Sequence, residues 1–179
     1  MASLFDSIKS YSVKPSKRKG VTVDEQLYYI KKVEGISPTF GYGSVLEIGC
    51  GNCLLPISLS RLRGVEVIGI DEWTEFPTRE EANHYVKMFK ADVALVEALI
   101  PLPFRDSSFD TVFAFLIFYA MKREKRREVV EEAKRVLKPN GRFVLVDIER
   151  GVKKDVNMKE VYSSSDQGVY ITVFTNEKQ

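Results

Sequence analysis

The sequence predicts an α/β fold with a mostly parallel sheet, and three observations predict it. An apolar run at 45–48 is followed at once by two glycines and then by an apolar helical pattern at 54–62, the order of a βα unit. A further apolar run at 65–70 again suits a buried strand. The continuous apolar stretch at 112–117 is what a central parallel strand, covered on both faces, requires.

Capping boxes and helix breakers place the helices. Thr22 with Glu25, and Thr78 with Glu81, match the pattern in which two side chains satisfy the first backbone groups of a helix. Gly64 is placed to end the helix that follows the glycine turn. Apolar residues at helical spacing predict one more, strongly amphipathic helix. The expected helices are 24–33, 53–63, 78–89 and 122–137.

Turn residues separate the later strands. Residues 138–141, Lys-Pro-Asn-Gly, predict a turn, and residues 166–168, Asp-Gln-Gly, predict a hairpin. The stretch 153–159 is too short and polar for a full helix. The expected strands are 45–48, 66–71, 90–93, 111–116, 142–147, 161–165 and 169–174.

Length and composition favour a single globular domain. A chain of 179 residues can bury a full core, and 44% hydrophobic with 29% charged residues is typical of soluble proteins. We expect residues 1–43 to form an arm and a helix that pack on the domain 44–179. No apolar run approaches the ~20 residues of a membrane span. The N-terminus lacks the order of a secretory signal, so a cytoplasmic location is expected.

The first βα unit carries the candidate ligand site. Gly49 and Gly51 let the backbone turn sharply and approach a ligand with no Cβ in the way. Glu47 stands near the end of the strand, where a carboxylate has no use in packing. Asp71 ends the next apolar run, twenty residues after Gly51, which places its carboxylate within reach of ribose hydroxyls. The pattern therefore indicates a nucleotide-like ligand.

Three motifs together resemble the class I S-adenosylmethionine-dependent methyltransferases. They are the apolar-apolar-Glu-x-Gly-x-Gly order at 45–51, Leu-Pro-Phe-Arg-Asp-Ser-Ser-Phe-Asp at 102–110, and Leu-Lys-Pro-Asn-Gly at 137–141. The family usually has a third glycine where this chain has Cys53. The resemblance covers residues 40–150 well and the ends loosely. It implies a three-layer α/β/α sandwich with strand order 3-2-1-4-5-7-6, an antiparallel last strand, and seven strands, with six as the alternative.

The resemblance also implies S-adenosylmethionine as cofactor and assigns its contacts. The methionine part would be held by Glu47, Gly49, Gly51 and Asn52, the ribose by Asp71 and Glu72, and the adenine by Asp92 with Val93. An insertion after Asp92 leaves Glu97 as a rival for that role. The implied cofactor-binding residues are Glu47, Gly49, Cys50, Gly51, Asn52, Asp71, Glu72, Asp92, Val93 and Phe115.

Other side chains do not define a second site. Cys50 and Cys53 form a Cys-x-x-Cys match but are better read as small residues of the glycine loop, because the single histidine, His84, is far along the chain. We therefore expect no metal site. No catalytic base can be named, and His84 is expected on the surface. Trp73 could line the adenine pocket or cover the core.

Two basic clusters have alternative readings. The cluster at 14–19 is read first as part of a solvated arm, with a lid over the active site, or an RNA-contacting arm, as the alternatives. The run 122–127 is the solvated start of a helix or, alternatively, a nucleic-acid face. A net charge of +2 by itself indicates neither nucleic acid nor membrane as partner.

The predicted function is methyl transfer to a small-molecule, protein or RNA acceptor. The fourth strand ends without the Asn/Asp-Pro-Pro-Tyr/Phe tetrapeptide or the cysteine that similar enzymes use on nucleic-acid bases, which disfavours those two chemistries. One alternative is an NAD(P)-dependent oxidoreductase, although its fingerprint would need glycine at Leu54. Another is a non-catalytic partner subunit that keeps the fold. A monomer or small homo-oligomer is expected.

Overall fold

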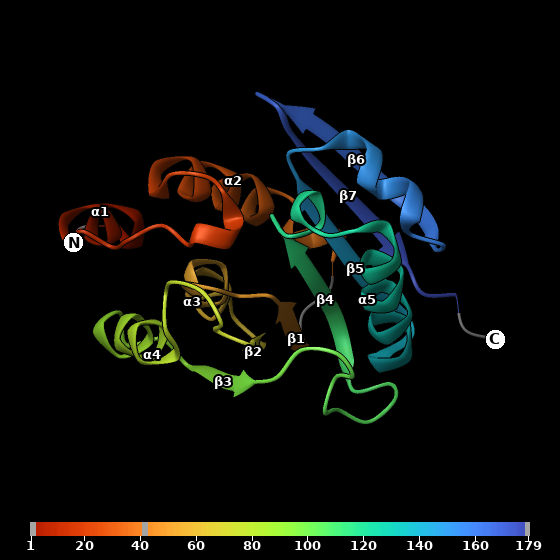
Figure 1. Cartoon of the computed structure of the whole chain (residues 1–179), viewed down its shortest axis with the longest axis horizontal. Helices are drawn as coiled ribbons and strands as arrows, with labels where there is room; N and C mark the ends of the chain where they lie inside the picture. Colours follow the sequence, from red (N-terminus) through yellow and green to blue (C-terminus); the bar gives the residue numbers. More distant parts are fainter. Residues whose placement is uncertain (1–2, 41–42, 178–179) are drawn as a thin grey trace.

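The structure, a computed structural model, describes residues 3–40 and 43–177. Within them, a seven-stranded sheet has the order β3-β2-β1-β4-β5-β7-β6 (Figure 1). The first five strands run parallel, while β7 is antiparallel to β5 and β6. The predicted strand order and the predicted number of seven strands are therefore confirmed. The strands are β1 (Gly43–Ile48), β2 (Val65–Asp71), β3 (Val93–Glu97), β4 (Phe109–Phe115), β5 (Leu137–Asp147), β6 (Lys159–Asp166) and β7 (Val169–Thr175).

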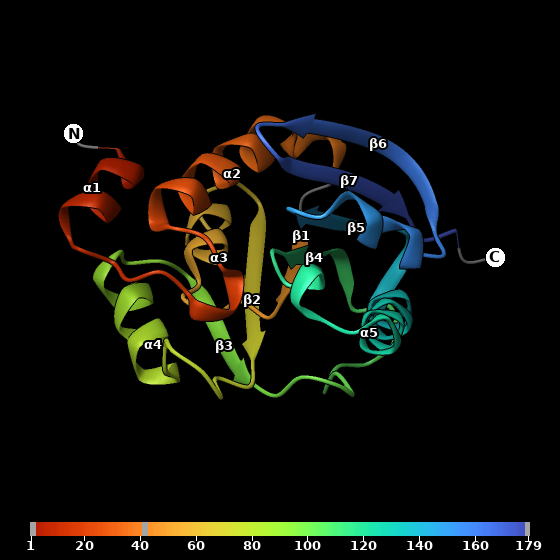
Figure 2. The same cartoon turned by 45° about the horizontal axis from the view of Figure 1, so that its top comes forward.

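Helices cover both faces of the sheet. Successive side chains of a strand point to opposite faces, so a strand that is apolar at successive positions must be covered on both. Val45 of β1 faces a core shared with the helices from the first half of the chain, whereas Leu46 faces a core shared with the last helix. Figures 1 and 2 show these two helical layers on either side of the strands. The α-helices are α1 (Leu4–Ser10), α2 (Val23–Gly35), α3 (Leu54–Leu59), α4 (Arg79–Met88) and α5 (Arg123–Val136).

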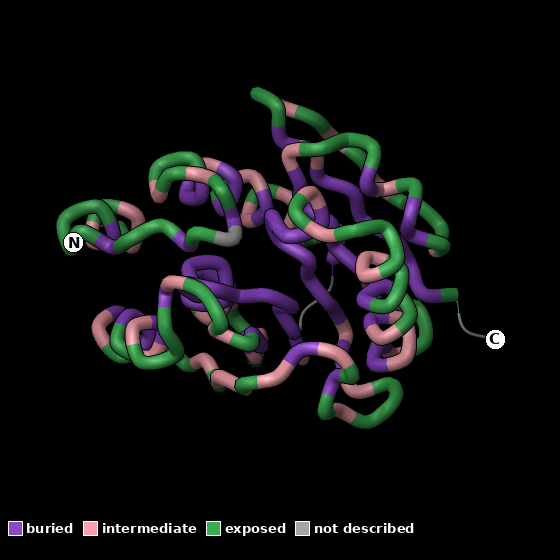
Figure 3. Tube along the Cα trace, in the orientation of Figure 1, coloured by how far each residue is buried: buried purple, intermediate pink, exposed green. Residues whose placement is uncertain are grey.

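Burial is deepest in the middle of the sheet. The tube of Figure 3 is buried along β1 and β4 and alternates between buried and exposed positions along the outer helices. Both predicted capping boxes form, with Thr22 at the start of α2 and Thr78 at the start of α4. None of the helices in the described residues has the length and apolar character needed to span a membrane. The cytoplasmic location and the division at residue 43 stay predictions.

The third strand differs from its prediction. We expected it at 90–93, but β3 occupies Val93–Glu97, and Asp92 precedes it. The register pairs Val67 with Val93 and Asp71 with Glu97, so Glu97 ends β3 beside the end of β2. In the described residues no helix follows β3 before β4 begins. The prediction that Asp92 follows the third strand is therefore wrong.

The expected turn at 138–141 is part of strand β5. Helix α5 runs directly into β5, and Leu137 already pairs with Phe109 of β4. The register then shifts, so that Thr111 pairs with Arg142, and Asn140 takes a left-handed backbone at φ 62°. A bulge, rather than a loop, absorbs the Lys-Pro-Asn-Gly residues. The hairpin between β6 and β7 forms as predicted, around Gln167 and Gly168.

Candidate functional site

The carboxyl ends of β1, β2 and β4 meet at the glycine loop. Ile48 of β1 pairs with Ile70 on one side and with Ala114 on the other. Gly49 and Gly51 then adopt positive φ angles of 73° and 55°, which side chains rarely tolerate. A parallel sheet places ligands at this edge, next to the point where the strand order reverses.

Asp71 ties the two neighbouring strand ends together. Its carboxylate accepts hydrogen bonds from the backbone N–H of Gly51 at 2.9 Å and from that of Trp73 at 2.8 Å. The indole Nε1 of Trp73 in turn donates to the carbonyl of Gly51 at 3.0 Å. The predicted pairing of the glycine loop with Asp71 is thus present in space. Trp73 lies against the loop itself.

A lysine that the sequence did not single out occupies the centre of the site. The ammonium of Lys19 donates to Glu47 Oε1 at 2.9 Å, to the carbonyl of Gly49 at 3.1 Å and to the carbonyl of Phe115 at 2.6 Å. Its side chain is 1% exposed, and Glu47 is fully buried. Basic residues also occupy 14 and 17, so composition gave no signal that position 19 differs.

This lysine belongs to the segment expected to be a solvated arm. Residues Lys17–Lys19 form a short 3₁₀ helix, η1, against the glycine loop. Ser16 and Lys19 are both buried there. The solvated reading is therefore wrong for these two side chains, and the arrangement is that of the alternative, a segment lying over the site.

Burial dominates the ionisation of Glu47. The pKa of Glu47 is raised from its ordinary value of 4.5 to about 7, first because burial penalises the charged carboxylate. Lys19 opposes this effect by its charge and its hydrogen bond, whereas the negative charge of Asp71 adds to it. Glu47 Oε2 has no hydrogen-bond partner. The site therefore holds a buried carboxylate with only one of its two oxygen atoms hydrogen-bonded.

The raised pKa predicts a pH-dependent stability. Between pH 5 and 7 the folded protein binds a proton at Glu47 more readily than the unfolded chain does, so this contribution is present at low pH and is lost as pH rises through 7. We expect the stability of the wild type relative to Glu47→Gln to fall by about 2–3 kcal/mol from pH 5 to pH 8. Urea unfolding of both proteins measures it. Parallel pH curves would contradict the assignment.

The two other predicted residues of the glycine loop, Cys50 and Asn52, are buried. Asn52 is buried, exchanges two side-chain hydrogen bonds with Gln26 of α2 at 2.8 and 2.9 Å, and donates to the carbonyl of Lys14 at 3.2 Å. Cys50 and Cys53 are free and buried, with their sulfurs 3.1 Å apart. In residues 3–40 and 43–177 no three His, Cys, Asp or Glu side chains cluster as a metal site would need.

The remaining predicted residues divide between the two ends of the sheet. Glu72 follows β2 and lines a hollow of about 470 Å³ with Ile117 and Tyr119, at the same edge as the glycine loop. Asp92 and Val93 lie at the opposite edge of the sheet, where β3 begins. They therefore cannot contact a ligand at the glycine loop together with the other predicted residues. Glu97 is the carboxylate at the correct end, and it pairs with Arg79 at 3.5 Å.

His84 and Phe115 lie where the sequence suggested. His84 is exposed on α4. Phe115 ends β4, and its ring lies 4.9 Å from the ammonium of Lys19. The contribution of Phe115 to the site is therefore both a carbonyl oxygen and an aromatic face.

The oxygen acceptors of the site fit an amino-acid ammonium, but the space is filled. The Glu47 carboxylate and the carbonyls of Gly49 and Phe115 converge on one positive nitrogen, which is what the α-ammonium of a methionine-like ligand needs. The hollow between Ser16, Gly51 and Trp73 measures only about 10 Å³. Small-molecule sites usually measure roughly 300–1,000 Å³. The α-ammonium of a cofactor could reach these acceptors only after Lys19 and its neighbours move.

Comparison with known proteins identifies relatives of this chain. The 27-O-demethylrifamycin SV methyltransferase of Amycolatopsis mediterranei is 32% identical over 160 residues, which are 83% of this chain and 55% of that protein. The methyltransferase GfsG of Streptomyces halstedii is 30% identical over 148 residues, 81% of this chain and 50% of that protein. The chain thus spans about half the length of these curated relatives.

Solved structures agree on the fold. The N-methyltransferase NodS of Bradyrhizobium japonicum superposes with a TM-score of 0.68 at 15% identity, covering 86% of this chain and 97% of that one. A chain from the complex of the Haloferax volcanii Trm112 methyltransferase activator with a methyltransferase gives a TM-score of 0.71 at 17% identity, covering 99% of each. Residues 46–145 match the family described as Methyltransferase domain. The chain therefore belongs to the class I methyltransferase family, whose cofactor is S-adenosylmethionine.

Proposed function

We propose that this chain transfers a methyl group from S-adenosylmethionine to a small-molecule acceptor. One observation carries the proposal: three oxygen atoms at the ends of β1 and β4 already converge on an ammonium. The family supports the cofactor, and the Amycolatopsis relative is named for a small-molecule acceptor. The hollow of about 470 Å³ beside Ile117 is of the size that such acceptors occupy.

Different residues of the site would hold different parts of the cofactor. Glu47 and the carbonyls of Gly49 and Phe115 would hold the α-ammonium, and Asp71 with Glu72 would face the ribose. The sulfonium of the bound cofactor supplies an already activated methyl group, so the protein is left with positioning. Holding the acceptor in line at contact distance supplies on the order of 7–11 kcal/mol.

The carboxylate of Asp71 gives the direct test of the cofactor site. We expect Asp71→Asn to weaken the binding of S-adenosylhomocysteine at least tenfold. The substitution removes the negative charge of the carboxylate that would accept hydrogen bonds from the ribose hydroxyls. Asp92→Asn is the matched control, since Asp92 lies at the opposite edge of the sheet and should leave binding unchanged. Isothermal titration calorimetry measures both. Equal affinities in the two variants would refute the proposed cofactor site.

Two further measurements separate the alternatives. Thermal unfolding with S-adenosylhomocysteine or NADH decides between a methyltransferase and an oxidoreductase, because a ligand stabilises the protein that binds it. We expect a shift with the first ligand and none with the second. Methyl transfer from labelled cofactor into fractions of a cell extract then identifies the acceptor class, and label in protein or RNA rather than small molecules would overturn that part of the proposal.

Dependence on a partner subunit is the second candidate. A chain that matches 99% of this one was solved in the complex of a Haloferax volcanii methyltransferase activator with a methyltransferase. The methyl-transfer assay should therefore be run with the purified chain alone and with any protein that co-purifies with it. Full activity of the chain alone would exclude this candidate.

A further inference from the structure

We propose that segment 14–20 is an autoinhibitory plug of the cofactor site, and that Lys19 and S-adenosylmethionine bind there in turn. The inference rests on the proposed function, because it takes the glycine loop as the cofactor site. It adds a regulatory contact that neither the fold nor the family requires.

The position of the Lys19 ammonium is the first argument. It makes hydrogen bonds to one carboxylate and two backbone carbonyls, all contributed by strand ends and the glycine loop. A buried lysine is costly unless its donors are satisfied, and here three oxygen atoms, one of them from Glu47, accept from the Lys19 ammonium. The ammonium of Lys19 thus uses the oxygen atoms that would otherwise receive the ammonium of the cofactor.

The rest of the segment closes the space beside the loop. A Cβ added to Gly51 would lie 2.5 Å from Ser16 Oγ and 3.6 Å from the Cε of Lys19, so the segment occupies the very side on which the glycine keeps room. The N–H of Lys17 donates to the carbonyl of Phe76 at 3.1 Å, which fastens the segment to the loop after β2. Together these contacts leave the hollow of about 10 Å³ described above.

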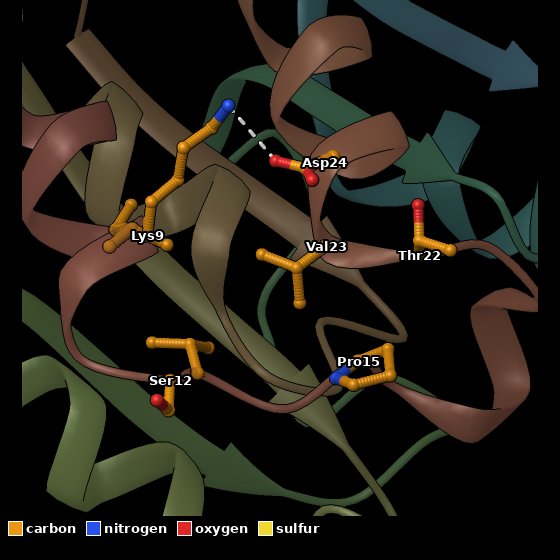
Figure 4. Close-up of a pocket in the computed structure, with 8 residues that line it drawn as sticks. Lys9, Ser12, Pro15, Thr22, Val23 and Asp24 are labelled. Atoms are coloured by element: carbon orange, nitrogen blue, oxygen red, sulfur yellow. Dashed lines mark ion pairs between the residues drawn. The ribbon is translucent and has the colours of Figure 1, made fainter.

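Two structural features flank Lys19 in the chain. Before it, the polypeptide borders an open hollow of about 460 Å³ between α1 and α2, and Figure 4 shows Ser12, Pro15 and Val23 around it. The ion pair that spans this hollow, Lys9 with Asp24 at 3.0 Å, is exposed at both ends and adds little stability. The plug ends at Gly20, which takes a left-handed backbone at φ 62° two residues before Thr22, the N-cap of α2.

Competition between the plug and the cofactor has a measurable consequence. When the competent state is only a fraction of the population, the apparent dissociation constant is the intrinsic one divided by that fraction. Any substitution that weakens the closed state therefore tightens cofactor binding. A lysine that contacts the bound cofactor would give the opposite result, so the direction of change decides between the two roles.

Calorimetric titration of S-adenosylhomocysteine into the wild type and three variants tests the plug. We expect Lys19→Met, which keeps the length of the side chain but not its charge, to bind roughly tenfold more tightly than the wild type or better. Lys9→Met is the matched control, because Lys9 lies on the surface, outside the site. This variant should bind S-adenosylhomocysteine with the affinity of the wild type. Gly20→Ala is a second variant, since a Cβ there would overlap the Tyr119 hydroxyl and would strain the left-handed backbone, which should loosen the segment without altering Glu47 or the glycine loop.

Limited proteolysis of the wild type gives an independent readout. We expect S-adenosylhomocysteine to accelerate trypsin cleavage at Lys17 or Lys19, because binding releases the segment. Equal or weaker binding by both Lys19→Met and Gly20→Ala, or protection of these bonds by the ligand, would overturn the plug alone. Absence of binding by every protein up to millimolar ligand would overturn the proposed function and the plug with it.

Discussion

Replacing Phe113 with alanine is expected to destabilise the protein by about 3–5 kcal/mol. Phe113 lies in the middle of β4, is completely buried, and meets the ring of Phe40 edge-on with centroids 5.1 Å apart. Truncation removes this contact and leaves a cavity between the sheet and the helices, which a central strand fixed on both sides cannot close. For a chain of this size the melting temperature should fall by about 6–20 °C.

An exposed position on the same sheet is the control for this cavity. Val161 on β6 is 47% exposed, so Val161→Ala should change the unfolding free energy by no more than about 0.5 kcal/mol. Urea unfolding at constant pH measures both variants. A loss below about 1.5 kcal/mol for Phe113→Ala, well under the roughly 3–5 kcal/mol expected, would show that the core around β4 can close the space left by the ring.

Asp147→Ala is expected to cost about 2–4 kcal/mol, the second largest effect. The Asp147 carboxylate ends β5 and accepts from the backbone N–H of Phe118 at 3.0 Å, Tyr119 at 3.2 Å and Glu149 at 3.1 Å. Alanine would leave these amides without their acceptor, and unsatisfied buried groups are expensive. The turn after β4, beside the glycine loop, would lose its anchor.

Asparagine at the same position separates charge from hydrogen bonding. Burial raises the pKa of Asp147, although the hydrogen bonds from the surrounding amides oppose that effect. A neutral acceptor of the same shape should therefore recover most of the stability, and Asp147→Asn should cost about 1 kcal/mol. Thermal unfolding at pH 7 compares the two. Equal losses in both variants would mean that the negative charge, not the acceptor geometry, holds the turn.

The sequence predicted the parts of the fold that depend on local pattern. Continuous apolar runs located β1, β2 and β4, and the strand order followed from the resemblance to a known family. Helix caps and helical periodicity located four of the helices, although α3 ends at Leu59 and not, as expected, just before Gly64. Asp71 was found by its offset from Gly51, because in a βαβ unit the length of the helix fixes where the next strand ends. These inferences need only neighbours in sequence.

The third strand was misplaced because it is an edge strand. Residues 93–97 are only partly buried, so their pattern lacks the continuous apolar run that marks a central strand. The carboxylate at 92 then seemed to follow a strand that in fact begins after it. A correct placement would have required knowing which residues pair with β2, and that information is spatial.

Lys19 could not have been found in the sequence by any local signal. Its three hydrogen-bond acceptors lie 28, 30 and 96 positions further along the chain. A lysine in a basic, proline-containing stretch ordinarily faces water. Only the folded chain shows that the ends of β1 and β4 make one oxygen-lined place that can hold a positive charge.

The buried thiols of Cys50 and Cys53 can report local opening of the protein. Cys50 and Cys53 are the only two cysteines in the chain, and both side chains are fully covered beneath the glycine loop. A thiol reagent can modify them only when the first βα unit opens, so the alkylation rate, read by mass, reports the local opening equilibrium without any introduced label.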